Sequence, residues 1–364
     1  MANRTRVAVI FGGRSSEHTI SCISAGSILR AIDQTKYEVV PIGITKEGRW
    51  VLETSDSAKL SITDGVFPVV DNSRSPVLFT PDPSATHLVV QSEVPDVLAQ
   101  VDVVFPVLHG PWGEDGTIQG LFELAGVPYV GSGVFASAAA MDKGHLKALM
   151  RAAGIPVGPY EVITDADWKL NQSQSLGRIK RLGLPIFVKP ARAGSSVGIS
   201  KVKRQEDLIP AIEFAREHDP KLIVEASQEN TREIECGVLG GPNGPRASVL
   251  AEIIVREGHE FYDFDAKYVD DSVELSVPAK LDSEITKRAQ DIACAAFTAI
   301  DGEGLARVDM FITGDQIVIN EINTMPGFTP ISMFPRMWNE SGMSYPELID
   351  YLISDALRRG TGLR

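Results

Sequence analysis

Two neighbouring stretches near the end of the chain alternate apolar and polar residues with a period of two. They span 304–313 and 317–327, and Gly314 and Asp315 lie between them. This period is typical of strands with one buried face, and a Gly-Asp pair is typical of a tight turn between such strands. The pattern predicts an antiparallel hairpin with one apolar face and one polar face.

The polar face of this hairpin carries its chemically active side chains. Arg307 and Asp309 share that face on the first strand, and Glu321 and Asn323 share a face on the second. A regular two-residue loop would pair Asp309 with Asn320 and turn Glu321 to the wrong face. One bulge, or a loop with an odd number of residues, instead pairs Asp309 with Glu321, and we predict this register. It also places Arg307 opposite Asn323.

Gathered on one surface, these side chains favour a divalent-cation site. The oxygens of Asp309, Glu321 and Asn323 are hard ligands, of the kind that suits Mg²⁺ when the ion also contacts a substrate phosphate. A solvated sheet face is the alternative that the hairpin alone leaves open.

Length and charge limit the classes of function. A chain of 364 residues is too long for one ordinary core, so two or three domains are expected. With 43% hydrophobic and 23% charged residues, the composition is that of a globular protein. The formal net charge of -13 argues against a nucleic-acid partner, because backbone phosphates would be repelled. An anionic substrate would need locally gathered Lys and Arg.

The cysteines and the apolar runs favour a reducing compartment. Cys22, Cys236 and Cys294 lie far apart without a C-x-x-C pair, so neither a disulfide framework nor a zinc site is indicated. No apolar run reaches the roughly 18 residues that span a bilayer. The N-terminus moves directly into a strand, unlike a signal peptide. We therefore expect a cytoplasmic protein without a membrane partner.

The chain opens with a strand over 6–11, a helix over 21–30 and a strand over 37–44. This order predicts a parallel sheet with helices on its faces. The G-x-G-x-x-G fingerprint of dinucleotide-binding sheets is absent. Ligands of such sheets bind at the carboxyl ends of the strands, which makes Glu17 and His18 site candidates. Capping of the following helix is the alternative for both.

The remainder of the first domain, predicted to span 1–138, is less regular. Residues 53–98 are rich in Ser, Asp, Pro and Thr and predict a loop excursion with short edge strands. A buried strand over 101–108 then leads into a glycine-rich loop, and a helix follows over 117–125.

The middle of the chain offers two lysines near a flexible loop. Lys143 lies on a helix predicted over 136–153, and residues 160–228 predict strand, helix, strand, loop, strand, helix and strand. One of these strands ends at Lys189, and a Gly/Ser loop over 190–198 joins it to the next as a hairpin flap. Backbone N–H groups and hydroxyls of such a flap could cradle phosphates. The P-loop sequence is absent, and an ordinary flexible hairpin is the alternative.

The last third contains further strands over 221–225 and 232–239 and helices over 283–300 and 345–358. Residues 260–271 are aromatic and charged without a clean period. Aromatic side chains in a loop need a surface to pack on, which favours a lid over a site; a surface loop over a satellite cluster is the alternative.

Six motifs together resemble those of the D-alanine–D-alanine ligases, a family with the ATP-grasp fold. They occur in the family's order and cover nearly the whole chain, and they are specific as a set although each alone is weak. They lie at residues 9–18, 108–120, 188–198, 261–268, 306–309 and 320–329.

The resemblance implies an α/β and α+β fold in three domains, opening with an N-terminal parallel-sheet domain. Residues 1–138 would bind the first D-alanine, 139–228 would form the central lid domain, and 229–364 would carry the metal site and a substrate lid loop. It implies ATP-dependent ligation of two D-alanines through a D-alanyl phosphate and a tetrahedral intermediate, for peptidoglycan precursor synthesis. A homodimer is also expected.

The resemblance further implies the residues that bind ATP and its metal ions. Those at the phosphates are Lys143, Lys189, Lys267 and, in the flap, Ser196. Those at the adenine and the ribose are Glu225, Ala226, Gln228 and Glu233. The ligands of two Mg²⁺ ions, for which Mn²⁺ substitutes, are Asp309, Glu321 and Asn323.

The catalytic residues are implied in the same way. Arg307 and the N–H of Gly327 would stabilise the oxyanion of the tetrahedral intermediate. Glu17 would accept the ammonium of the first D-alanine and would be tied through Ser195 to Tyr268 of the lid.

The amino-acid subsites complete the implied set. His109 would lie beside the first subsite, and Ser332 and Met333 would flank the second. Tyrosine at position 268 favours D-alanine as second substrate, whereas relatives that use D-serine or D-lactate tend to differ there and remain the alternative. Pro330 departs from the family pattern and removes one N–H near the second subsite. A catalytically inactive nucleotide-binding protein is disfavoured because the metal ligands and Arg307 are all present.

Overall fold

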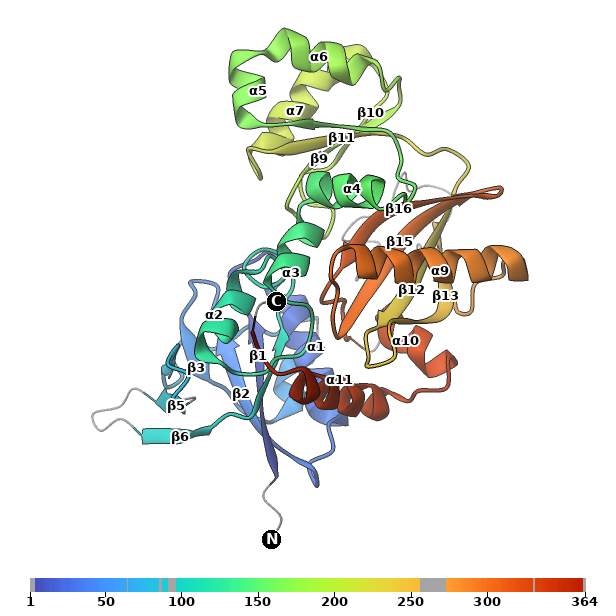
Figure 1. The fold of residues 1–364 in the computed structure, drawn as a ribbon. Coiled ribbons are helices and arrows are strands. Elements are labelled where there is room, and N and C mark those ends of the chain that lie inside the picture. The colour runs from blue at the N-terminus through green and yellow to red at the C-terminus, as the bar shows by residue number, and fades with distance from the viewer. Residues whose placement is uncertain are drawn as a thin grey trace.

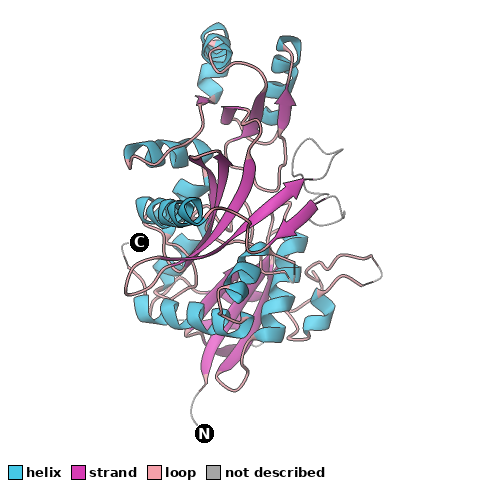
Figure 2. Ribbon diagram, turned by 90° about the vertical axis from the view of Figure 1, so that its right-hand side faces the viewer, coloured by secondary structure: helices cyan, strands magenta, loops and turns pink. Residues whose placement is uncertain are grey.

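The fold is described from a computed structural model, which describes residues 4–63, 65–84, 87–90, 96–255, 273–329 and 331–362. Within these residues the strands form four sheets, three of them with four or five strands. Figure 1 shows β9 (Ile186–Pro190), β10 (Ser200–Val202) and β11 (Leu222–Ala226), strands of the central sheet, at the top of the molecule. Figure 2 shows the main sheets following one another along the long axis of the molecule, with helices at their flanks.

The N-terminal sheet has the strand order β3-β2-β1-β7. Its strands are β1 (Thr5–Gly12), β2 (Tyr37–Ile44), β3 (Trp50–Leu52) and β7 (Val103–Val107). β1 pairs in parallel with β2 and β7, which confirms the predicted parallel sheet. Residues 7–11 of β1 are fully buried because helices cover the sheet, as expected for a central parallel strand. The helices of this part are α1 (His18–Ala31) and α2 (Thr117–Ala125), and the C-terminal helix α11 (Tyr345–Arg359) packs into the same core.

The predicted loop excursion contains short strands, as expected. They are β4 (Val77–Phe79), β5 (His87–Val90) and β6 (Asp96–Gln100), which form a small antiparallel sheet of their own, preceded by the 3₁₀ helix η1 (Ser57–Leu60).

The prediction of a single helix over 136–153 is wrong, because the chain forms two helices there. They are α3 (Val134–Met141) and α4 (Lys143–Ala152). Asp142 between them is extended, and its carboxylate accepts the N–H groups of Gly144 and His145, both at 3.1 Å. An aspartate in this position caps the second helix and stops the first. The break places Lys143 at the first turn of α4.

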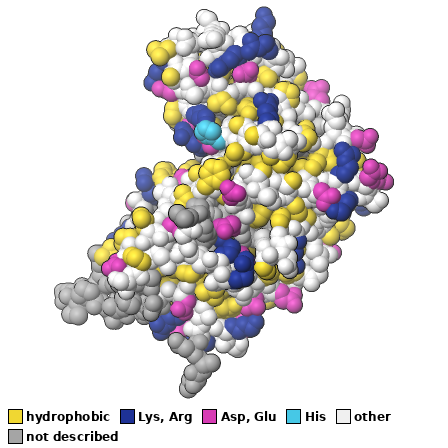
Figure 3. Space-filling model, in the orientation of Figure 1, with side chains coloured by type: hydrophobic (Ala, Val, Ile, Leu, Met, Phe, Trp, Pro, Cys, Tyr) yellow, Lys and Arg dark blue, Asp and Glu magenta, His cyan; other side chains and the backbone are white. Residues whose placement is uncertain are grey.

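The central sheet has the order β10-β9-β11-β8, with antiparallel neighbours throughout. Its strands are β8 (Tyr160–Ile163), β9 (Ile186–Pro190), β10 (Ser200–Val202) and β11 (Leu222–Ala226). The helices beside it are α5 (Asp165–Leu170), α6 (Gln172–Lys180) and α7 (Leu208–Arg216), with the 3₁₀ turn η2 (Gln205–Asp207). β9 and β10 pair as the hairpin that the sequence predicted, so the Gly/Ser loop is a flap between them. On the face drawn in Figure 3, a notch sets this part off from the rest of the molecule.

The C-terminal sheet has the order β14-β13-β12-β15-β16. Its strands are β12 (Arg232–Leu239), β13 (Arg246–Val255), β14 (Val273–Ser276), β15 (Leu305–Thr313) and β16 (Gln316–Asn323), and its helices are α9 (Ser283–Ala299) and α10 (Met333–Glu340). Strand β13 and helix α10 were not predicted. α9 begins at an Asp282 cap and packs against Val308 and Met310, the apolar face of the hairpin.

The register of β15 and β16 is the predicted one. Asp309 pairs with Glu321 and Arg307 with Asn323, whereas Met310 pairs with Ile319. The turn at Gly314-Asp315 has two residues, so the extra residue is accommodated by a bulge at Asn320 rather than by a longer loop. The bulge returns Glu321 to the face that carries Asp309.

No helix among the described residues combines the length and the apolar composition needed to cross a membrane.

Candidate active site

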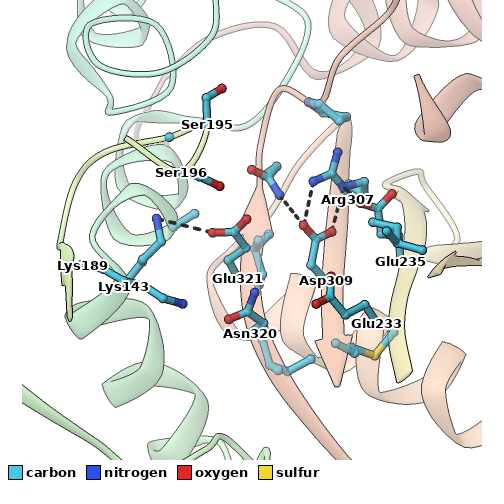
Figure 4. Close-up of a pocket in the computed structure, with 18 of the residues that line it drawn as sticks. Lys143, Lys189, Ser195, Ser196, Glu233, Glu235, Arg307, Asp309, Asn320 and Glu321 are labelled. Carbon is cyan, nitrogen blue, oxygen red and sulfur yellow. Dashed lines mark hydrogen bonds and ion pairs between the residues drawn. The ribbon is translucent and has the colours of Figure 1, made fainter. Parts of the chain in front are cut away.

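A cavity of about 340 Å³ is lined by residues of the central and C-terminal sheets and their loops, and by residues that follow β1 and β7 of the N-terminal sheet (Figure 4). Every site residue implied by the family resemblance that the structure describes lines it. These are Glu17, His109, Lys143, Lys189, Ser195, Ser196, Glu225, Ala226, Gln228, Glu233, Arg307, Asp309, Glu321, Asn323, Gly327, Ser332 and Met333. The predicted Lys267 and Tyr268 lie outside the described residues, as do the whole predicted lid over 260–271 and Pro330. Residues up to 316 positions apart in the chain are therefore brought to one cavity, from Glu17 to Met333.

Arg307 is the centre of a charged cluster on the polar face of the hairpin (Figure 4). Its Nε and Nη2 atoms each donate to Asp309 at 2.7 Å, and its Nε lies 3.3 Å from Glu235 on β12. Burial alone would lower the pKa of Arg307, but the carboxylates of Asp309 and Glu235 outweigh it and raise the pKa well above its usual value. The guanidinium is thus permanently charged. Glu235 was missed because only the pairing of β12 with β15 places it beside Asp309.

Lys143 connects three elements. Its Nζ lies 3.4 Å from Glu321 on β16 and donates to the carbonyl of Ala193 in the flap at 3.0 Å. Lys143 thus sits between the carboxylate surface and the flap.

Lys189 and Glu225 form a second charged cluster. They are diagonal neighbours on β9 and β11, and Lys189 Nζ lies 2.5 Å from Glu225 Oε2. Lys147, which the sequence analysis missed, lies 2.7 Å from Glu225 Oε1. Its signal was its spacing, since it follows Lys143 by four residues on α4 and so shares a helix face with it. Burial would raise the pKa of Glu225, but Lys147 and Lys189 outweigh it, so that pKa lies well below its usual range.

The predicted contact of Glu17 with the flap is present. The Ser195 hydroxyl donates to Glu17 Oε1. The capping alternative for Glu17 is wrong, because its side chain makes no capping hydrogen bond to α1. His18 points elsewhere: its ring bonds the Gly13 carbonyl at 2.7 Å and the Val70 N–H at 3.1 Å. Of the two candidates at this strand end, Glu17 alone lines the cavity.

His109 is held as a neutral ring beside Glu17. Its Nδ1 lies 3.0 Å from the Met325 carbonyl and its Nε2 3.2 Å from the Ser24 hydroxyl, which accepts the Phe328 N–H. Burial lowers its pKa more than Glu17 raises it. A neutral ring that donates from Nδ1 to the carbonyl accepts the Ser24 hydroxyl proton at Nε2.

Glu114 is another buried carboxyl that the sequence analysis missed. It accepts the N–H of Gly110 at 2.7 Å and that of Met325 at 3.2 Å, and so joins the loop after β7 to the loop after β16. Burial, together with the charge of Glu17, raises the pKa of Glu114 to about 8.

The loop after β16 also lines the cavity. Ser332 precedes α10, and its hydroxyl accepts the Thr329 N–H at 3.0 Å. A Cβ at Gly327 would lie 2.7 Å from the Ser332 oxygen, so glycine is needed there for the close approach. Ser332, Met333 and the Gly327 N–H are therefore near neighbours.

The donor set on the hairpin fits a hard divalent cation. Asp309 and Glu321 are register partners, and Asn323 lies two residues beyond Glu321 on the same face. Asn323 donates its Nδ2 to Asp309 at 3.1 Å, so its amide would turn over to offer oxygen. Among the described residues no group of three or more His, Cys, Asp and Glu is placed to hold a metal ion. A cation here therefore needs the Asn323 oxygen or substrate phosphate oxygens to complete its shell.

Two family models match most of the chain. The "D-ala D-ala ligase N-terminus" model matches residues 6–132, and the "D-ala D-ala ligase C-terminus" model matches residues 149–354. The chain belongs to the D-alanine–D-alanine ligase family. The family predicted from the six motifs is thereby confirmed.

Curated relatives match this chain over their whole length. The chain is 56% identical to a D-alanine–D-alanine ligase from Nocardia farcinica, with 100% of both chains covered. It is 55% identical to one from Mycolicibacterium gilvum, again with 100% of both covered.

Solved structures confirm the ATP-grasp fold. The VanG D-Ala:D-Ser ligase from Enterococcus faecalis superposes with a TM-score of 0.84 at 38% identity, covering 97% of this chain and 100% of that one. The D-alanine–D-alanine ligase from Coxiella burnetii gives a TM-score of 0.82 at 35% identity, covering 98% and 95%.

Proposed function

We propose that this protein joins two D-alanines to D-alanyl-D-alanine, with conversion of ATP to ADP and phosphate, for peptidoglycan precursor synthesis. The observation that carries the proposal is the content of one cavity. Glu17 and Arg307, proposed as the ammonium acceptor and the oxyanion donor, line it together with Lys143 and Lys189, whose positive charges suit phosphates. Full-length curated relatives bear the same activity in their names.

ATP is proposed to lie between a central domain (139–228) and a C-terminal domain (229–364), with 1–138 as the N-terminal domain. The separate sheets of the three segments support this division. Lys143 and Lys189 would bind the phosphates under the flap and Ser196. The groups proposed at the adenine and the ribose are Glu225, Ala226, Gln228 and Glu233. Lys267 is proposed for the γ-phosphate.

Asp309, Glu321 and Asn323 are proposed to hold two Mg²⁺ ions, for which Mn²⁺ substitutes. Bound divalent ions offset the negative charge of the phosphates and so lower the barrier to phosphoryl transfer. The fork of hydrogen bonds from Arg307 to Asp309 fixes that carboxylate before any ligand arrives.

The reaction proceeds in two steps. A carboxylate oxygen of the first D-alanine attacks the γ-phosphorus and ADP leaves, which gives D-alanyl phosphate. The amine of the second D-alanine attacks the acyl carbon, and the tetrahedral oxyanion collapses with loss of phosphate. Arg307 and the Gly327 N–H would stabilise that oxyanion, because fixed donors in a cavity need little reorganisation as charge develops.

Two sets of cavity residues are proposed to position the two D-alanines. Glu17 would hold the ammonium of the first D-alanine, fixed by Ser195 and by Tyr268, with neutral His109 beside it. Ser332 and Met333 would bind the second D-alanine near the Gly327 N–H.

A phosphate-release assay tests the proposal. In the presence of ATP and Mg²⁺, release should depend on D-alanine and should not respond to L-alanine. Release without D-alanine dependence would refute the proposed ligase.

The likeness to a D-Ala:D-Ser ligase gives a specific second candidate. Offering D-serine and D-lactate beside D-alanine distinguishes the two, and we expect D-alanine to be preferred. Cytoplasmic action is also proposed, because the three free cysteines, two of them buried, suit a reducing compartment. A homodimer is proposed as well. Light scattering of the purified protein measures the oligomeric state.

A further inference from the structure

The Glu225 carboxylate is clamped between two ammonium groups. Lys147 meets its Oε1 at 2.7 Å and Lys189 meets its Oε2 at 2.5 Å. The side chain of Glu225 is 10% exposed and that of Lys147 only 4%. The Glu225 carboxylate thus meets two cations in a place nearly closed to water. One of them, Lys189, is also attracted by the carboxylates of Glu321 and Glu233.

The two lysines differ in what else holds them. Lys147 Nζ also lies 3.5 Å from the carbonyl of Ile319 on β16, so it is fixed between two sheets. Lys189 has its ammonium 5.5 Å from the Phe187 ring centre, and its side chain is 13% exposed toward the cavity. Lys189 is therefore the lysine whose ammonium group can move to a bound ligand, whereas Lys147 stays in contact with Glu225.

We infer that Lys147 is a positioning residue that keeps Glu225 charged and in place when Lys189 leaves it for the phosphates of a bound nucleotide. The inference rests on the proposed function, in which Lys189 binds phosphate and Glu225 faces the adenine. It extends that function by assigning a role to Lys147, the second lysine at Glu225. A lone carboxylate at this depth would be strongly disfavoured unless it took up a proton.

The charge of Glu225 has a consequence for base selection. An ionised carboxylate accepts hydrogen bonds only, so it suits the 6-amino group of adenine and repels the 6-carbonyl of hypoxanthine. A protonated Glu225 could donate to that carbonyl. Lys147 thereby determines the preference for adenine nucleotides without contacting the base.

The substitution Lys147→Met separates this role from a structural one. Methionine is unbranched and similar in length but uncharged, and without ligand Lys189 still balances Glu225 one to one. The loss of Lys147 should weaken nucleotide binding, because Glu225 is left without a cation when the nucleotide draws Lys189 away. We expect ADP affinity, measured by calorimetry with Mg²⁺, to fall about 10²-fold, the scale for stranding one member of a buried ion pair. The preference for ADP over IDP should shrink in the same variant.

Rescue by a second substitution is the decisive measurement. Glu225→Gln in the Lys147→Met background removes the stranded charge, so the double variant should bind ADP more tightly than Lys147→Met alone. Lys169→Met is the matched control, because Lys169 forms a 2.7 Å pair with Asp165 on the exposed surface of α5. It should leave ADP affinity unchanged.

Three results would overturn the inference. Lys147→Met that lowers the melting temperature but keeps ADP affinity and the ADP/IDP preference would make Lys147 merely structural. Equal weakening in the single and double variants would mean that Lys147 acts on the nucleotide directly. If the single variant does not fold, the double variant is compared with Glu225→Gln, and any loss of ADP affinity between those two counts against the inference. A wild-type protein that binds no ADP would instead refute the proposed function.

Discussion

Replacing Arg307 by alanine tests the central contact of the site. The guanidinium donates twice to Asp309 at 2.7 Å and approaches Glu235 at 3.3 Å, so the substitution removes the proposed oxyanion donor and leaves two carboxylates without their shared cation. Loss of one preorganised donor lowers kcat by about 10²–10³. Nucleotide binding should persist, because Lys143 and Lys189 are unaltered.

The same substitution should lower stability by a predictable amount. Breaking a buried ion pair costs about 3–5 kcal/mol. The Arg307 side chain is 19% exposed and opens on the cavity, which places the expected loss near the lower end of that range. Asp309 and Glu235 would gain effective negative charge, so Mg²⁺ should bind at least as tightly as before and should recover part of the stability.

Steady-state kinetics, ADP calorimetry and urea unfolding with and without Mg²⁺ measure these effects separately. Arg232→Ala is the matched control: it removes a similar two-pronged pair, to Glu252 at 2.6 Å, from the same sheet but outside the cavity. It should lower stability and leave kcat nearly unchanged. Loss of ADP binding in Arg307→Ala, or an equal loss of kcat in the control, would refute the role given to Arg307.

Three further predictions concern other contacts of the cavity. Ser195→Ala removes the hydroxyl that donates to Glu17; kcat/KM for D-alanine should fall by about 10- to 10²-fold, the scale of one neutral-to-charged hydrogen bond, and an unchanged kcat/KM would contradict the proposed tie. Gly327→Ala would put a Cβ 2.7 Å from the Ser332 oxygen; KM should rise for the second D-alanine more than for the first, which initial-rate analysis of the two binding steps measures. The raised pKa of Glu114, about 8 against an ordinary 4.5, means that the folded protein keeps a proton that the unfolded chain has lost. Stability should therefore fall as pH rises from about 4.5 to about 8, and unfolding curves of Glu114→Gln should show a weaker decline.

The hairpin shows how much chemistry alone can predict. Asp309 and Glu321 can serve one site only if their side chains lie on the same face of the hairpin. This requirement predicted a register shift between the two strands that the turn sequence does not reveal. The structure provides that shift through the bulge at Asn320. The parallel opening sheet and the flap were likewise predictable, because each depends on local periodicity and glycine placement.

Residues whose role depends on distant partners were not predictable. Glu235 becomes part of the site only through the pairing of β12 with β15, and Glu114 only because its carboxyl reaches Met325, which is 211 residues away in the chain. Lys147 looks like any helix lysine until β11 places Glu225 against it. The break at Asp142 was missed because helix periodicity on both sides hid the cap.

The Ser195–Glu17 hydrogen bond joins the flap proposed to cover the phosphates to the side chain proposed to bind the amino acid. A ligand that binds to Glu17 therefore alters the Ser195–Glu17 hydrogen bond, either by competing for it or by strengthening it. Thermodynamic reciprocity then requires that whatever D-alanine does to nucleotide affinity, nucleotide does equally to D-alanine affinity. Compounds that mimic the amino acid alone should therefore differ in potency between nucleotide-depleted and nucleotide-rich conditions, and screening should be done in both.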